Sequence, residues 1–227
     1  MSKFIFMLTH NDVTVANARE IYESVADLAI PFVGFKDIGL PIDELKALAD
    51  DIRSNGQEVM LEVVSEKRED ELRSIQAGLD IGVDYILGGT HAADGVKLLE
   101  GSGVAYMPFP GEIVGHPSKL CGTIESISES ARELAQIPGV AGLDLLAYRF
   151  SGDVENLIKS VVQAVECPVI AAGSIASVDR IHTVSKLDTW GFTVGSAAFE
   201  GQFEGGKSLK EQLSTILRAA DNAKTLA

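Results

Sequence analysis

Eight short apolar runs recur along the chain, and an amphipathic stretch follows each of them. The runs are nearly continuous in hydrophobic residues, which is typical of strands buried on both faces of a parallel sheet. A regular alternation of such strands with helices places the chain in the α/β class. The runs occupy residues 3–8, 31–35, 58–63, 83–87, 104–107, 140–146, 168–172 and 190–194.

The number of these units selects one architecture within the α/β class. Eight strand–helix units fill the 227 residues with short loops, and no linker or low-complexity stretch interrupts them. We therefore predict a single (β/α)8 TIM barrel over residues 1–227. A doubly wound open sheet also alternates strands and helices, but no Gly-rich dinucleotide fingerprint follows the first run. The expected helices are 15–28, 42–54, 66–78, 92–100, 131–136, 153–165, 177–185 and 208–223, with an N-cap at Ser65 and a capping box at Ser126 and Glu129.

Composition and charge exclude several classes of protein. A hydrophobic content of 46% is too high for a disordered chain. No apolar run reaches the roughly 18 residues that a membrane span needs. The net charge of −14, with no basic patch, argues against nucleic-acid binding. Cys121 and Cys167 show no paired spacing and the N-terminus lacks the features of a signal peptide, so we expect a cytoplasmic protein.

Two Gly-Ser pairs follow the last two strands of the expected barrel. Gly173 and Ser174 end the seventh strand, and Gly195 and Ser196 end the eighth. Each pair precedes a helix, where backbone N–H groups and the positive end of the helix dipole favour a dianionic phosphate. Barrels often place a phosphate site at these two loops. The pairs therefore predict a phosphate-binding site, although a single pair would be explained by a tight turn alone.

The same segments carry a resemblance to a known group of proteins. Residues 169–175 (VIAAGSI) and 191–199 (GFTVGSAAF) resemble the ribulose-phosphate-binding barrel superfamily. This superfamily includes sugar-phosphate epimerases, histidine-biosynthesis isomerases, indole-pathway barrels and relatives of orotidine-phosphate decarboxylase. The resemblance implies that Gly173, Ser174, Gly195 and Ser196 hold a substrate phosphate. It does not fix the reaction.

Three charged residues interrupt the apolar runs at positions where local sequence gives no reason for them. Lys36 follows the second run, Glu62 lies in the third and Asp144 in the sixth. Burying a charge is costly unless it is paired or solvated, so such positions often mark functional sites. Glu62 could abstract a proton beside a carbonyl, Lys36 could stabilise the enediolate oxygen, and Asp144 could be a second acid or base. The alternative is a buried ion-pair network that serves the fold alone.

Further candidates lie in the loops that should surround the pocket. His91 follows two glycines after the fourth strand and is the best-placed histidine for moving a proton. His10, Asn11 and Asp12 follow the first strand and are expected to contact substrate, or else to cap the next helix. The Pro- and Gly-rich segment 108–117 is expected to form a rigid loop over the pocket. Tyr148 and Arg149 follow the sixth strand, where they either help to bind substrate or only precede the next helix.

A metal site is the weaker interpretation of the same residues. His10, Asp12, Glu62 and His91 could converge on a divalent cation. The pentose-phosphate epimerases of the superfamily use His and Asp ligands, but on other strands and in combinations that this sequence does not match. We therefore expect no metal and no redox cofactor. The decarboxylases of the superfamily have an Asp-x-Lys-x-x-Asp motif, whereas residues 62–66 here read EVVSE, which argues against that reaction.

The leading hypothesis is a sugar-phosphate isomerase or epimerase that acts on a small phosphorylated metabolite. Two alternatives remain open. One is a Schiff-base aldolase or lyase in which Lys36 is the covalent amine. The other is a non-catalytic barrel that binds a phosphorylated metabolite, because a fold does not fix a function. The helical exterior of a barrel also suits association into a homo-oligomer, but no segment of the sequence indicates an interface.

Overall fold

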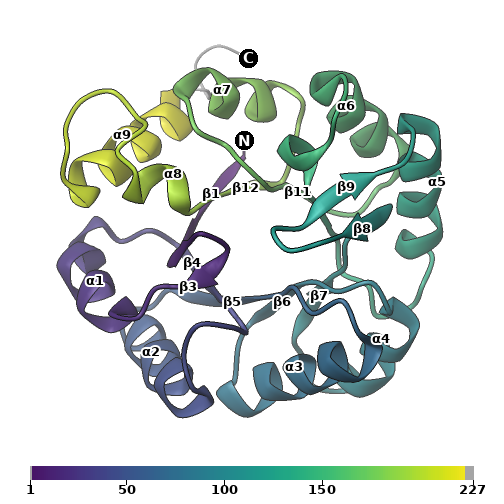
Figure 1. The fold of residues 1–227 in the computed structure, drawn as a ribbon, viewed down its shortest axis with the longest axis horizontal. Coiled ribbons are helices and arrows are strands. Elements are labelled where there is room, and N and C mark those ends of the chain that lie inside the picture. Colours follow the sequence, from purple (N-terminus) through teal and green to yellow (C-terminus); the bar gives the residue numbers. More distant parts are fainter. Residues whose placement is uncertain (1, 223–227) are drawn as a thin grey trace.

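Eight parallel strands form the centre of the computed structural model, which describes residues 2–222. Each strand overlaps one of the eight apolar runs, and the predicted (β/α)8 barrel is confirmed (Figure 1). The strands neighbour one another in the order β10-β11-β12-β1-β4-β5-β6-β7. Their bounds are β1 Lys3–Met7, β4 Phe32–Lys36, β5 Glu58–Val63, β6 Tyr85–Gly88, β7 Ala105–Met107, β10 Leu143–Leu145, β11 Val169–Ala171 and β12 Gly191–Val194.

The barrel closes between β7 and β10 through a short contact. Tyr106 and Val140 form an isolated parallel bridge, and the amide of Ala141 donates to the carbonyl oxygen of Tyr106 at 2.8 Å. The amide of Asp144 donates to Pro108 at 3.1 Å. Because these bonds join the two outermost strands, the C-terminal ends of all eight strands surround one opening, as the architecture requires.

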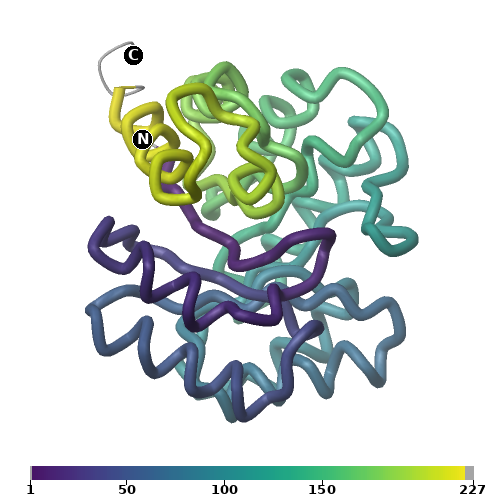
Figure 2. The backbone as a smooth tube through the Cα atoms, turned by 60° about the vertical axis from the view of Figure 1, so that its left-hand side comes forward, coloured from purple at the N-terminus to yellow at the C-terminus, as the bar shows by residue number. Residues whose placement is uncertain are grey.

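Helices surround the strands as a ring, which Figure 1 shows from one end of the barrel. In Figure 2 the N-terminal half forms the lower part of the molecule and the C-terminal half the upper part. The helices are α1 Ala18–Val25, η1 Ala26–Leu28, α2 Ile42–Ser54, α3 Arg68–Ile81, α4 Ala92–Leu99, α5 Ile124–Ala135, η2 Ala147–Arg149, α6 Val154–Ala164, α7 Val178–Lys186, α8 Ser196–Phe199 and α9 Leu209–Asn222. In the described part of the chain, no helix has the length and apolar character needed to cross a membrane.

Two predicted helix caps are wrong. The helix expected after Ser65 begins at Arg68, and the Ser65 hydroxyl instead donates to Asp37 at 3.2 Å. The box expected at Ser126 and Glu129 lies one turn earlier: Thr123 is the N-cap of α5, and its side chain and that of Ser126 bond each other's backbone amides. The real helix is therefore longer than the 131–136 segment that apolar spacing indicated.

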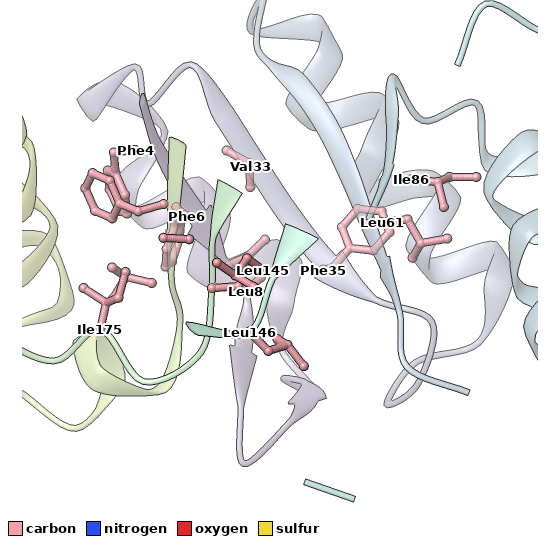
Figure 3. Close-up of a cluster of buried hydrophobic side chains, with 14 of the residues drawn as sticks. Phe4, Phe6, Leu8, Val33, Phe35, Leu61, Ile86, Leu145, Leu146 and Ile175 are labelled. Carbon is pink, nitrogen blue, oxygen red and sulfur yellow. The ribbon is translucent and has the colours of Figure 1, made fainter. Parts of the chain in front are cut away.

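The side chains of the strands divide between two apolar layers. Those that point outward pack against the helices, and Phe35, Leu61 and Ile86 lie together in this layer in Figure 3. Those that point inward form a separate cluster inside the barrel, made of Ile5, Met7, Phe32, Met60, Leu87, Met107 and Ile170. Successive residues of a strand point to opposite faces, so Lys36, Glu62 and Asp144 share the inward face with members of this second cluster.

Two small hairpins cover the C-terminal end of the barrel. β2 (Thr9–His10) and β3 (Val13–Thr14) pair across a two-residue turn directly after β1. β8 (Glu112–Val114) lies within the segment 108–117 that was expected to be a rigid loop, and it pairs with β9 (Lys119–Cys121) just beyond that segment, so this part of the expected loop is a strand. These strands are too short, and too close to Pro and Gly, to have been distinguished from a loop by their sequence pattern.

Candidate active site

A cavity of about 200 Å³ opens at the C-terminal ends of the strands. Its lining combines charged side chains with the two Gly-Ser loops of the seventh and eighth strands of the barrel. The charged members are Asp12, Lys36, Glu62, Arg149 and Glu200, and the loop members are Gly173, Ser174, Gly195 and Ser196. This location is where barrels of this architecture carry their active sites.

Lys36 and Glu62 form the floor of the cavity. They are register partners on the neighbouring strands β4 and β5, so both side chains enter the barrel at the same level. The Lys36 Nζ lies 3.3 Å from Glu62 Oε2 and 2.7 Å from Asp12 Oδ1. Lys36 is 5% exposed and Glu62 is 8% exposed. Burial alone would lower the pKa of Lys36, but the negative charges of Glu62 and Asp12 outweigh it and raise that pKa, which favours the ammonium form.

Asp12 reaches Lys36 because of the turn that carries it. Asn11 and Asp12 have φ angles of 50° and 66°, both in the left-handed region, as a two-residue hairpin turn of type I′ requires. The hairpin is tied to β4 by Thr14, whose hydroxyl accepts from the amide of Lys36 at 2.8 Å and donates to its carbonyl oxygen at 2.9 Å. The turn therefore holds the Asp12 carboxylate beside the ammonium, and Asn and Asp are the residues other than glycine that adopt this left-handed conformation most readily.

Arg149 supplies a second cation on the other side of Asp12. It lies in η2, directly after β10, and its Nη2 donates to Asp12 Oδ1 at 3.0 Å while Nη1 donates to the carbonyl oxygen of Ser118 at 3.2 Å. Burial would raise the pKa of Asp12, but Lys36 and Arg149 together lower it below its usual value. Asp12 is thus an anion shared by two cations. Its contact with substrate remains a prediction.

Asp144 is the most deeply buried acid of the barrel interior. It is 0% exposed, and neither of its carboxylate oxygens has a hydrogen-bond partner among residues 2–222. Its register partner on β11 is Ile170, a member of the inner apolar cluster. Burial, and then the charge of Glu62, raise the pKa of Asp144 well above 3.8, against the opposing effect of Lys36. The neutral acid is therefore the favoured form.

The two Gly-Ser loops lie at the rim of the cavity. Gly173 has a φ of 106°, a conformation that side chains other than glycine rarely adopt. Gly195 precedes α8, and a Cβ at this position would come within 2.5 Å of the Thr9 hydroxyl. Ser196 accepts a bond from the amide of Asn11 at 3.2 Å. Both glycines are thus required by the local geometry, and their role in binding phosphate remains a prediction.

The remaining predicted site residues lie outside the cavity lining. The described residues that line it do not include His10, Asn11, His91 or Asp144. His10 Nε2 instead lies 3.3 Å from Glu200, and His91 Nδ1 lies 2.7 Å from Glu71 Oε2, a carboxylate of α3. The four residues considered for a metal do not converge. Within residues 2–222, no group of three or more His, Cys, Asp or Glu side chains is placed to hold a metal ion.

Five polar or charged residues of the cavity lining were not predicted from the sequence, namely Thr9, Ser118, Thr193, Glu200 and Gln202. Thr193 is buried in β12 and points inward, two residues before Gly195, where its hydroxyl interrupts an otherwise apolar run. Ser118 comes from the turn of the β8–β9 hairpin. Thr193 could have been predicted from the sequence, because the alternation of inward and outward side chains along the strand places it on the inward face. Ser118 could not, because only the hairpin brings it to the cavity.

Comparison with known proteins identifies relatives of this barrel. No protein-family model matches the chain. The sequence is 28% identical over 155 residues to a 1-(5-phosphoribosyl)-5-((5-phosphoribosylamino)methylideneamino) imidazole-4-carboxamide isomerase from Methanocella arvoryzae, covering 61% of this chain and 60% of the relative. A protein of the same name from Methylobacillus flagellatus is 25% identical over 199 residues, covering 78% of this chain and 77% of the relative. The match thus spans less than two thirds of the length of the first relative.

Solved structures with a similar fold are also barrels that act on phosphorylated compounds by their names. Orotidine 5'-phosphate decarboxylase from Pyrococcus horikoshii has a TM-score of 0.67 at 17% identity, covering 96% of this chain and 99% of that chain. N-(5'-phosphoribosyl)anthranilate isomerase from Pyrococcus furiosus has a TM-score of 0.61 at 17% identity, covering 98% and 100%. The chain resembles the ribulose-phosphate-binding barrels. The ribulose-phosphate-binding resemblance expected from the two Gly-Ser motifs is confirmed, whereas the roles of individual residues stay predictions.

Proposed function

We propose that this barrel is an isomerase or epimerase that acts on a small phosphorylated sugar by proton transfer beside a carbonyl group. The observation that carries this proposal is the Lys36 ammonium, held 2.7 Å from Asp12 and 3.3 Å from Glu62 on the floor of a cavity with two Gly-Ser loops. The relatives from Methanocella and Methylobacillus are named as isomerases, which supports the reaction class.

The proposed reaction begins with Glu62. Its carboxylate takes a proton from the carbon beside the carbonyl, and the electron pair of the broken C–H bond moves to the carbonyl oxygen and forms an enediolate. The Lys36 ammonium faces the same cavity and stabilises the negative charge that develops on that oxygen. Asp12 keeps the ammonium in place. No bond in the step needs an electron acceptor, so no redox cofactor takes part.

A second buried acid, Asp144, accompanies Glu62 in the barrel interior. The pKa of Asp144 is raised by burial and by Glu62, so Asp144 holds a proton when most aspartates have lost theirs. Asp144 already holds a proton and is absent from the cavity lining, so the proton taken by Glu62 stays on Glu62. Glu62 returns it to the neighbouring carbon of the enediolate while the hydroxyl proton on that carbon moves to the first oxygen, so the carbonyl group moves by one carbon and Glu62 is a carboxylate again. We assign Asp144 to the neutral acid beside Glu62 rather than to direct contact with substrate.

The substrate phosphate would bind at the opposite rim of the cavity from Glu62. Gly173, Ser174, Gly195 and Ser196 together offer backbone amides and hydroxyls on two adjacent loops. Glycine at the two key positions lets an anion approach the backbone closely. The partner is therefore a small phosphorylated metabolite. Such a substrate, together with two free cysteines, fits the reducing cytoplasm.

The environment of Lys36 disfavours the aldolase alternative. A Schiff base forms from the neutral amine, whereas Glu62 and Asp12 raise the pKa of Lys36 and favour its charged form. A purely binding barrel would have little use for Asp144, a buried acid without a hydrogen-bond partner in the described structure. Both features support the enediolate reaction.

Exchange of substrate hydrogen with solvent tests this proposal directly. In D2O, the protein is incubated with a panel of pentose and hexose monophosphates, and NMR records incorporation of deuterium beside the carbonyl. The wild type is expected to exchange at least one of them, and Glu62→Gln to lower the rate by about 10²- to 10⁴-fold. Glu133→Gln, on the exposed face of α5, is the matched control and should exchange at the wild-type rate. Full exchange by Glu62→Gln would contradict the assignment of the base.

A further inference from the structure

A second glycine-rich loop lies directly across the barrel from the Gly195-Ser196 loop. β6 ends at Gly88, and Gly89, Thr90 and His91 lead into α4. In the strand order, β6 and β12 are four positions apart in a ring of eight, so the two loops face each other across the opening. By its sequence alone, this loop offers the same combination of glycine and helix N-terminus that would favour a second phosphate.

In the structure, a carboxylate of the protein itself binds to the amides of this loop. The carboxylate of Glu71, from α3, accepts from the amides of Thr90 and His91 at 2.9 Å each. It also lies 2.7 Å from His91 Nδ1 and 3.3 Å from the Thr90 hydroxyl. Glu71 is 0% exposed. The donors that a phosphate would need at this helix start therefore already bond a buried carboxylate.

The packing around the glycines supports this arrangement from both sides. A Cβ at Gly89 would come within 2.7 Å of Glu71 Oε1, so a glycine is required for the carboxylate to approach the loop. A Cβ at Gly88 would come within 2.7 Å of the ring of Phe109, which packs over the loop from the β7 side. The space left beside Gly89, Thr90 and Phe109 is about 40 Å³. This is roughly the volume of one water molecule and far less than a phosphorylated sugar needs.

We infer that Glu71 restricts the substrate to a compound with one phosphate, bound at the Gly173–Ser174 and Gly195–Ser196 loops. This inference rests on the proposed function, because it takes that phosphate site as given. The name of the curated relatives describes a compound with two phosphoribosyl groups, hence two phosphates at its two ends. In this chain, a second phosphate at the far end would meet the negative charge of Glu71 and amides that already have an acceptor. Glu71 thus acts as a specificity residue.

Inorganic phosphate locates the open anion sites. Crystals of the wild-type protein soaked in phosphate are expected to show it at Gly173–Ser174 and Gly195–Ser196 and not at Thr90 and His91. Phosphate on the amides of Thr90 and His91 in the wild type would overturn the inference about Glu71 and leave the proposed function standing. Phosphate at neither loop would overturn the proposed phosphate site itself, so the two failures are distinguishable.

A pair of ligands measures the same effect in solution. Ribose 5-phosphate and the bis-phosphoribosyl compound named for the relatives are titrated by calorimetry into the wild type, Glu71→Gln and Glu71→Ala. The wild type should bind the bis-phosphoribosyl compound no more tightly than ribose 5-phosphate, because the amides that a second phosphate would need already bond Glu71. In the variants, the preference should shift toward the bis-phosphoribosyl compound by at least about tenfold. A wild type that binds this compound tenfold more tightly than ribose 5-phosphate would overturn the inference even if neither variant folds.

Discussion

The two ends of strand β4 perform different tasks. Phe32 begins the strand and Lys36 ends it, and both side chains point into the barrel. The Phe32 ring meets Trp190 and Tyr85 edge-on, with centroids 5.4 Å and 6.0 Å apart, and the Lys3 ammonium lies over Phe32 and Trp190. At the other end, Lys36 lies between carboxylates. Only three residues of one strand therefore separate an apolar closure from a charged cavity.

This difference indicates that one end of the barrel contributes mainly to stability and that the other end holds the groups proposed for the reaction. The closed end buries the ring of Phe32 between the partly buried rings of Tyr85 and Trp190, and burial of apolar area is the main source of stability. The open end buries charges, whose desolvation is offset only by their partners. Mutations at the closed end should therefore lower stability and leave the reaction of the folded protein intact. Mutations that remove both members of an ion pair at the open end should lower the rate of the reaction and leave stability nearly unchanged.

The largest expected effect on stability is at the closed end. Phe32→Ala removes a side chain that is only 5% exposed and leaves a cavity between Trp190 and Tyr85. The free energy of unfolding should fall by about 3–5 kcal/mol, as measured by urea denaturation. Phe32→Leu is the milder control and should lose less. An unchanged turnover per folded molecule would support the view that this end of the barrel serves stability alone. A loss of turnover under conditions in which all of the variant is folded would contradict it.

The opposite outcome is expected when the ion pair at the open end is neutralised. The double variant Lys36→Met, Glu62→Gln removes both members of the pair, so neither charge is left buried alone, and Asp12 keeps its bond to Arg149. Turnover should fall by at least about 10²- to 10³-fold. The free energy of unfolding should change by no more than about 1 kcal/mol, because replacing both partners of a buried pair is often neutral.

Two measurements check that double variant. Steady-state kinetics with the substrate found by deuterium exchange gives the turnover, and denaturation gives the stability. Lys46→Met, on the exposed face of α2, is the matched control for the loss of one lysine. A double variant that keeps its turnover would show that Lys36 and Glu62 form a structural pair. The charged end of the barrel would then have no role in catalysis through these two residues.

The sequence predicted the strands and part of this site for physical reasons. Strands buried on both faces are visible as apolar runs, and Lys36 and Glu62 were visible because they break those runs. Asp12 was visible only as a loop residue, since its contact with Lys36 depends on the left-handed turn after β1. Glu71 was not visible at all. It stands in an acidic stretch at the start of α3, where a carboxylate usually faces solvent, and only the packed structure turns it toward the loop of His91.

A further effect expected at the open end is a dependence of stability on pH. Asp144 has a pKa raised well above the ordinary value of 3.8, so above pH 4 the native state holds a proton that the unfolded chain has lost. The contribution of Asp144 to stability is therefore complete below pH 3.8 and declines as the pH rises toward its pKa in the folded protein. Asp144→Asn cannot titrate and should lack this decline, which is at most about 1.4 kcal/mol per pH unit.

Urea denaturation of wild type and Asp144→Asn from pH 4 to pH 9 measures that decline. The difference in free energy of unfolding, variant minus wild type, should grow with pH, while any cost of the unpartnered amide only shifts the whole curve by a constant. Asp80→Asn, exposed on α3, provides the control for loss of an aspartate. If the difference stays flat over the whole range, Asp144 is ionised in the native state, and its assignment as the protonated acid behind Glu62 is wrong.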